Sequence, residues 1–118
     1  MCGAIAFTWH GKPRFVGDCV CESCRRAHGA SAVAWFGGPA EQFSIDQGES
    51  ELHWYQSSVE SERGFCQSCG TRFLFRSSKW PNEIHVAVAN LHAPHDLVSG
   101  GVAFKDELPD WTAMKIKT

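Results

Sequence analysis

Short segments in which hydrophobic and polar residues alternate follow one another along this chain, and turn-forming residues separate them. From Ile84 to Val88 the larger apolar residues alternate with smaller or polar ones, as in a strand with one buried face. Glycine and proline stand between such segments, for example at 11–13, 37–39 and 100–101. Segments rich in β-branched and aromatic residues predict strands at 4–9, 14–19, 32–36, 51–56, 62–65, 72–75, 84–89 and 102–105.

Helical signals are few. The clearest helix is expected at 23–28, and a further helical turn at 39–43, where Pro39 suits a first-turn position. The prediction is therefore a mainly β fold of short antiparallel strands with one or two short helices. Around Leu74, the alternation places Phe73 and Phe75 together on the opposite face of the sheet. Most aromatic rings are assigned to the core, with Trp35 or Trp54 as candidates for a cleft.

Composition narrows the class of protein. A chain of 118 residues without internal repeats or long linkers predicts one domain, 1–118. The net charge of −2 argues against nucleic-acid binding. No apolar run approaches the roughly 20 residues that cross a bilayer, so no membrane association is expected. The N-terminus lacks the basic start and long apolar core of a signal peptide, which predicts a cytoplasmic location.

The six cysteines change the picture most. Cys2 stands alone, three more occur within Cys19-Val20-Cys21-Glu22-Ser23-Cys24, and two in Cys66-Gln67-Ser68-Cys69. Each C-x-x-C step places two sulfurs on one side of a tight turn, which is typical of zinc knuckles at strand ends. Three disulfides are disfavoured by the paired spacing and the reducing location. A thioredoxin-like redox pair at Cys66 and Cys69 is disfavoured because no βαβ pattern surrounds it.

Two arrangements of zinc ligands are compatible with the spacing. In one, Cys21, Cys24, Cys66 and Cys69 form a single closed site, which leaves Cys2 and Cys19 outside it. In the other, Cys19, Cys21 and Cys24 form a three-thiolate site with an open fourth position, and Cys2 joins Cys66 and Cys69 in a second site. The sequence thus predicts one or two zinc ions per chain.

Several motifs carry a family resemblance over nearly the whole length. They are Cys2-Gly3-Ala4-Ile5, the C-x-C-x-x-C-R-R step from Cys19 to Arg26, the G-F-C-x-x-C-G-T step from Gly64 to Thr71, and Leu108-Pro109-Asp110-Trp111. With these motifs the chain resembles the glutathione-dependent formaldehyde-activating enzymes and their relatives, a group that includes centromere protein V. The resemblance implies a β-tent fold with a structural and a catalytic zinc site.

The resemblance also assigns the cysteines. It places Cys2, Cys66 and Cys69 at the structural zinc, and Cys19, Cys21 and Cys24 at the catalytic zinc. The family's N-terminal C-x-C-G occurs here only as Met1-Cys2-Gly3, so its first cysteine has no counterpart in this sequence. The structural site would then hold three thiolates and take its fourth ligand from another group.

The implied activity is that of a zinc-dependent carbon–sulfur lyase or thiol-adduct synthase, similar to S-(hydroxymethyl)glutathione synthase, which holds a substrate thiolate at a three-cysteine zinc. A small thiol such as glutathione is the expected substrate. Arg25 and Arg26 are candidates for binding its carboxylates, because guanidinium groups bind carboxylates bidentately. They could equally be surface residues or bind backbone carbonyls, and Arg63 could serve either the site or the fold. His28 is a candidate for the metal or the bound thiol, or else a helix-end side chain.

An alternative from another class is a non-catalytic, zinc-stabilised binding module. A single closed four-cysteine site would favour that alternative, whereas an open three-cysteine site favours the enzyme. The sequence does not indicate an oligomeric state or the physiological thiol and electrophile.

Overall fold

Two β-sheets account for most of the regular structure in a computed structural model that describes residues 1–116. A seven-stranded sheet has the order β5-β6-β7-β8-β3-β2-β9, and a two-stranded sheet pairs β1 with β4. The strands are β1 Ala6–Trp9, β2 Phe15–Cys19, β3 Val33–Pro39, β4 Phe43–Gln47, β5 Leu52–Gln56, β6 Ser61–Cys66, β7 Arg72–Ser77, β8 Glu83–Ala87 and β9 Val102–Ala103. The α-helix is α1, Glu22–His28, and short 3₁₀ turns lie at Ala40–Gln42, Glu49–Glu51, Val88–Asn90 and Lys105–Glu107.

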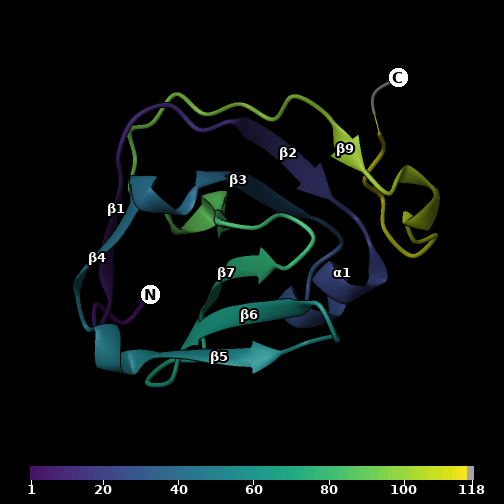
Figure 1. The fold of residues 1–118 in the computed structure, drawn as a ribbon. Helices are drawn as coiled ribbons and strands as arrows, with labels where there is room; N and C mark the ends of the chain where they lie inside the picture. Colours follow the sequence, from purple (N-terminus) through teal and green to yellow (C-terminus); the bar gives the residue numbers. More distant parts are fainter. Residues whose placement is uncertain (117–118) are drawn as a thin grey trace.

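Strand pairing is antiparallel throughout the larger sheet except at β9, which runs parallel to β2 and aligns Ala103 with Cys19. The expected mainly β fold with antiparallel strands is confirmed. Figure 1 shows β2 and β9 on the opposite side of the molecule from β5 and β6, with α1 at one end and the β1–β4 pair at the other. Within the described residues, none of the helices is long and apolar enough to cross a membrane.

Most of the buried hydrophobic residues form two clusters. One contains Phe36, Phe73, Leu74, Ile84 and Val86, and the rings and aliphatic chains of the β1–β4 pair pack against it. The other cluster consists of Cys19, Cys24, Val33, Trp35 and Ala87, with Phe15, Cys21 and Phe75 against it. The second cluster therefore includes Cys19 and Cys24 of the C-x-C-x-x-C step, and Cys21 packs against it. These cysteines are thus part of the core or in contact with it.

Two local expectations need correction. The segment Phe43–Gln47 was not expected to be a strand, yet it pairs with β1. It directly follows the 3₁₀ turn Ala40–Gln42, which lies within the helical turn predicted at 39–43. The alternation expected around Leu74 is wrong at Phe73. Gly64 pairs with Leu74 and Phe65 pairs with Arg72, so Phe73 is the extra residue of a β-bulge. Phe73 therefore joins Leu74 in one buried cluster, while Phe75 lies against the other.

Candidate metal centres and the adjoining pocket

The first cysteine group consists of Cys19, Cys21 and Cys24, whose sulfur atoms all lie within 4.8 Å of one another. Cys19 is the last residue of β2, and Cys21 caps the N-terminus of α1, where its Sγ accepts a hydrogen bond from the backbone N–H of Cys24 at 3.4 Å. The C-x-C-x-x-C spacing thus joins a strand end to the first turn of a helix and brings three sulfurs to one point.

Helix α1 is held at both ends. At its C-terminus Gly29 adopts the left-handed conformation, with φ of 60°, and its N–H donates to the carbonyl of Arg25. At its N-terminus the backbone N–H of Glu22 donates to the Glu107 carboxylate, at 3.0 Å. The C-terminal segment therefore fixes the helix start that carries Cys21 and Cys24.

A buried arginine lies beside the first cysteine group. Nη2 of Arg63 on β6 lies 3.7 Å from Sγ of Cys24 and donates to Oγ of Ser23 at 2.9 Å. The hydrogen bond from Cys19 lowers the pKa of Cys24, burial opposes that shift, and the positive charge of Arg63 adds to the lowering. The same hydrogen bond, together with burial, raises the pKa of Cys19. The site thus favours a thiolate at Cys24 even without a metal.

The second cysteine group consists of Cys2, Cys66 and Cys69, again with sulfur atoms within 4.8 Å of one another. Cys66 ends β6, and the chain turns so that Gly70, at φ of +80°, donates its N–H to the Cys66 carbonyl at 2.7 Å. A hydrogen bond with the Thr71 hydroxyl, at 3.1 Å, helps to lower the pKa of Cys69 to about 6. Cys2 reaches this turn from the N-terminal segment.

Both groups fit zinc. In a tetrahedral site with Zn–S bonds of about 2.3 Å, two sulfurs lie about 3.8 Å apart, and Sγ of Cys2 and Sγ of Cys66 are separated by 3.8 Å. All six cysteines are free thiols. The single closed site of Cys21, Cys24, Cys66 and Cys69 is not assembled, because its two halves belong to different groups. In the described part of the chain, both groups consist of cysteines alone, without a histidine.

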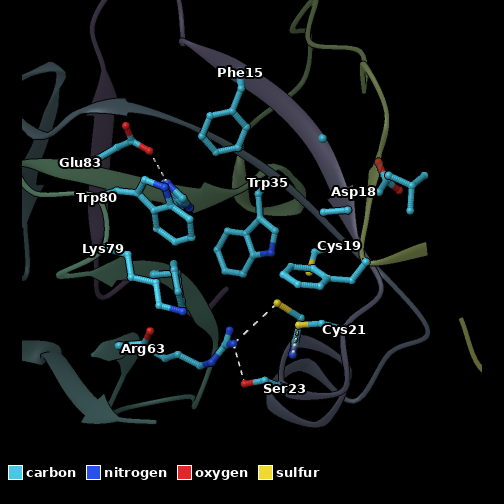
Figure 2. Close-up of a pocket in the computed structure, with 18 of the residues that line it drawn as sticks. Phe15, Asp18, Cys19, Cys21, Ser23, Trp35, Arg63, Lys79, Trp80 and Glu83 are labelled. Atoms are coloured by element: carbon cyan, nitrogen blue, oxygen red, sulfur yellow. Dashed lines mark hydrogen bonds and ion pairs between the residues drawn. The ribbon is translucent and has the colours of Figure 1, made fainter. Parts of the chain in front are cut away.

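A cavity of about 810 Å³ opens beside the first cysteine group. Aromatic residues make up much of its wall: Phe15, Trp35, Phe75, Trp80, His85 and Phe104. Successive rings are in contact, from Trp35–Phe75 at 6.1 Å between centroids to Phe75–His85 at 5.6 Å and Phe15–His85 at 4.8 Å. Figure 2 shows Trp35 between Cys19 and the Phe15 and Trp80 rings. The sulfurs therefore lie at one end of a largely apolar pocket.

Charged groups occur at defined points of this wall. In Figure 2 the guanidinium of Arg63 points toward Cys21 and Ser23. Glu83 accepts from Arg14 at 2.8 Å and lies 2.7 Å from Nε2 of His85, so its charge is already matched by protein groups. Lys79 also lines the pocket. Asp18, the residue before Cys19 on β2, lines the pocket as well. A polar substrate would thus meet Arg63 next to the sulfurs, with Asp18, Lys79 and Glu83 as further charged groups of the wall.

The arginines predicted to bind substrate lie outside the pocket wall. Nε of Arg25 donates to the Val20 carbonyl at 2.9 Å, and Arg26 is largely exposed and forms an ion pair with Glu22 on the same helix. Arg63, which shares a pocket with the first cysteine group, is the residue best placed among the three. The role of Arg25 and Arg26 in binding stays a prediction.

Of the other residues predicted to belong to a cleft or the site, some line the pocket and some do not. Trp35 lines the pocket, whereas Trp54 lies elsewhere and stacks under Arg76. His28 packs edge-on against Trp35 and is absent from both cysteine groups. Sequence reasoning missed Glu83 and His85. Their alternation along β8 was visible, but nothing in the sequence showed which face would meet the pocket.

Comparisons with known proteins add to this geometry. A family model described as "Glutathione-dependent formaldehyde-activating enzyme" matches residues 1–105. Among solved structures, the chain is similar to a crystal structure of a Rhodobacter sphaeroides protein, with 22% identity and a TM-score of 0.65, over 80% of this chain and 85% of that chain. That likeness supports the fold alone. No match was found among curated proteins.

Proposed function

Because the chain belongs to the glutathione-dependent formaldehyde-activating enzyme family, we propose that it joins a small thiol to an aldehyde and catalyses the reverse carbon–sulfur cleavage. The proposed thiol is glutathione, and the adduct with formaldehyde is S-(hydroxymethyl)glutathione. In this assignment the protein is a carbon–sulfur lyase or thiol-adduct synthase, and Cys19, Cys21 and Cys24 are its catalytic metal ligands.

One observation carries the proposal: three cysteine sulfurs converge at the wall of a pocket large enough for a peptide-sized thiol. A purely structural zinc is closed by four protein ligands, whereas a catalytic zinc keeps a position for substrate. Both cysteine groups offer three cysteine ligands, and of the two it is the first that faces the cavity, where a substrate could take the fourth position. This arrangement supports thiol exchange at that position and argues against a binding module built on one closed site.

Zinc held by these three thiolates would supply a binding position at which a substrate thiol loses its proton near neutral pH. The side chains around this position would provide an apolar wall and compensate negative charge. The rings of Trp35, Phe75 and Trp80 give the pocket an apolar wall beside the reacting sulfur. Arg63 offsets negative charge beside Cys24, where three thiolates and an incoming sulfur would otherwise repel one another.

The second cysteine group is assigned to a structural zinc, which gives two zinc ions per chain. Cys2, Cys66 and Cys69 tie the N-terminal segment to the turn after β6, and these residues do not line the pocket. A metal at this point would stabilise the fold by linking distant parts of the chain. Six free thiols that serve as metal ligands also favour the reducing cytoplasm as the location.

The test combines zinc content with catalysis above the spontaneous reaction. Elemental analysis of metal-replete protein should give near two zinc ions per chain, and near one in Cys21→Ser. Release of formaldehyde from preformed adduct, followed with a trapping dye, should be faster with wild type than with Cys21→Ser or buffer. If wild type and Cys21→Ser release formaldehyde equally fast, the enzyme proposal is wrong and the binding-module alternative gains support.

A further inference from the structure

Arg63 is a buried arginine, and two of its nitrogen atoms have no hydrogen-bond partner within the described residues. Its side chain is 5% exposed, and Nη2 has two partners, Ser23 and Cys24. Nε and Nη1 are buried and have no hydrogen-bond acceptor within the described residues. A buried donor without an acceptor costs free energy, so such groups in native proteins call for an explanation. Here the guanidinium lines the pocket beside the first cysteine group, where a reacting substrate would lie.

The guanidinium is also held in one orientation. It lies over the ring of Phe75, with Cζ 5.0 Å from the ring centroid, and the hydrogen bond to Ser23 anchors Nη2 to helix α1. Strand β6 carries the side chain, with Arg63 paired to Tyr55 on one side and Phe75 on the other. Donors fixed in this way stabilise developing charge without first having to reorganise.

The position of Arg63 selects among possible acceptors. Nη2 is 3.7 Å from Sγ of Cys24, so the guanidinium is in direct contact with the first cysteine group. In a thiol–aldehyde adduct the former carbonyl oxygen is two covalent bonds from the substrate sulfur. The carboxylate oxygens of glutathione are at least seven bonds from its sulfur and would lie farther along the pocket. The carbonyl oxygen is therefore the substrate acceptor that best matches this site.

We propose, on the basis of the function proposed above, that Arg63 is a catalytic residue whose Nη1–H group forms the oxyanion site for the aldehyde oxygen. In the forward step a lone pair of the substrate thiolate forms the carbon–sulfur bond, and the π electrons of the carbonyl move to oxygen. Nη1 of Arg63 donates a hydrogen bond to that oxyanion, and the guanidinium keeps its own protons. Water then supplies the proton that gives the neutral hydroxyl group, and the reverse reaction retraces these steps.

The experiment compares Arg63→Gln, Arg63→Lys and Arg63→Ala with wild type in adduct formation and release. Removal of an oxyanion donor should lower kcat by about 100- to 1,000-fold, with the dissociation constant for the thiol, from calorimetry, changed less than about 3-fold. Zinc content should stay at the wild-type value. Added guanidinium should restore part of the activity of Arg63→Ala. Arg76→Gln, which removes an arginine from the neighbouring strand outside this pocket, is the matched control and should keep its kcat.

The outcomes separate this proposal from the function on which it rests. A wild type no faster than Cys21→Ser would overturn the proposed function itself. An active wild type with unchanged kcat in Arg63→Gln, or with a loss confined to thiol affinity, would overturn the role of Arg63. If the variants do not fold, the Nη1–H signal of Arg63 in nitrogen-15 NMR of wild type decides. It should shift when thiol and aldehyde are both present and not with thiol alone, and an unchanged signal would contradict the proposal.

Discussion

The imidazole of His28 meets the indole of Trp35 edge-on, with ring centroids 5.2 Å apart and an interplanar angle of 89°. This contact packs the last turn of α1 against β3, and Trp35 in turn lines the pocket. Burial of His28, with further contributions from the positive charges of Arg63 and Arg72, lowers its pKa to about 4. The histidine is thus neutral in the folded protein at neutral pH.

We expect this contact to make stability depend on pH. Between pH 6.5, the ordinary pKa of histidine, and pH 4, the unfolded chain binds a proton at His28 that the folded chain does not. The free energy of unfolding therefore falls as the pH is lowered through this window, by at most about 3 kcal/mol from this residue. Urea unfolding of wild type and His28→Gln at pH 7, 6 and 5 measures the effect.

The comparison with His28→Gln removes the contribution of metal release, which both proteins share. Wild type should lose more stability than the variant between pH 7 and pH 5. His10→Gln, which replaces a more exposed histidine hydrogen-bonded to Ser44, is a control and should follow the wild-type profile. Parallel profiles for wild type and His28→Gln would contradict the view that the lowered pKa of His28 makes stability depend on pH.

A second prediction concerns Gly37, which lies beneath the aromatic wall of the pocket. A Cβ at this position would lie 2.7 Å from both the His85 and the Phe15 ring and 2.9 Å from the Ile84 carbonyl. Gly37→Ala must therefore displace these rings and should cost about 1–3 kcal/mol, as overpacking does. We expect a lower melting temperature and altered binding of apolar probes in the pocket, measured by calorimetry and fluorescence.

Gly101→Ala is the matched control, because Gly101 also lines the pocket but a Cβ there would have no neighbour within 4 Å. Its melting temperature should stay close to that of wild type. Equal destabilisation by Gly37→Ala and Gly101→Ala would mean that the close contacts around residue 37 are not what makes a larger side chain there unfavourable.

The strands could be predicted where local pattern decides them. Residues 84–88 alternate clearly, and the strand is found at Glu83–Ala87. Phe43–Gln47 was missed because five residues with exposed Asp46 and Gln47 give a weak pattern, and its strand state depends on pairing with β1. Phe73 was placed on the wrong face because a bulge is set by the register of two strands, which the sequence of one strand does not show.

The candidate site was likewise predictable only where local sequence spacing decides it. The cysteines could be predicted as ligands because C-x-x-C spacing alone brings two sulfurs together. The partner of each C-x-x-C pair depends on tertiary structure, so the spacing left the four-cysteine and the split arrangements open. Arg63 is almost 40 residues from Cys24 in sequence, and only the pairing of β6 with its neighbours brings it to the metal site.

A third prediction tests the apolar cluster that supports the pocket from behind. Phe36 is 1% exposed and meets Trp9 edge-on at 5.2 Å between centroids. Phe36→Ala removes this contact and leaves a cavity, so the free energy of unfolding should fall by about 3–5 kcal/mol. Val59→Ala, at a position 92% exposed, should change it by less than about 0.5 kcal/mol. Denaturant unfolding of both variants checks the prediction, and a similar small change in both would contradict the assignment of Phe36 to the core.

The two cysteine groups should differ in what they contribute when they lose their metal. Cys69→Ser opens the group that ties the N-terminal segment to the turn after β6, so it should lower the melting temperature strongly and make it insensitive to further chelator at that site. Cys21→Ser opens the group that lines the pocket, where the helix start is still held by Glu107, so its thermal stability should fall less than its activity. Scanning calorimetry with and without chelator, together with zinc analysis, measures both effects. If Cys21→Ser destabilised the fold as much as Cys69→Ser while activity declined in parallel, the division into a structural and a catalytic centre would be wrong.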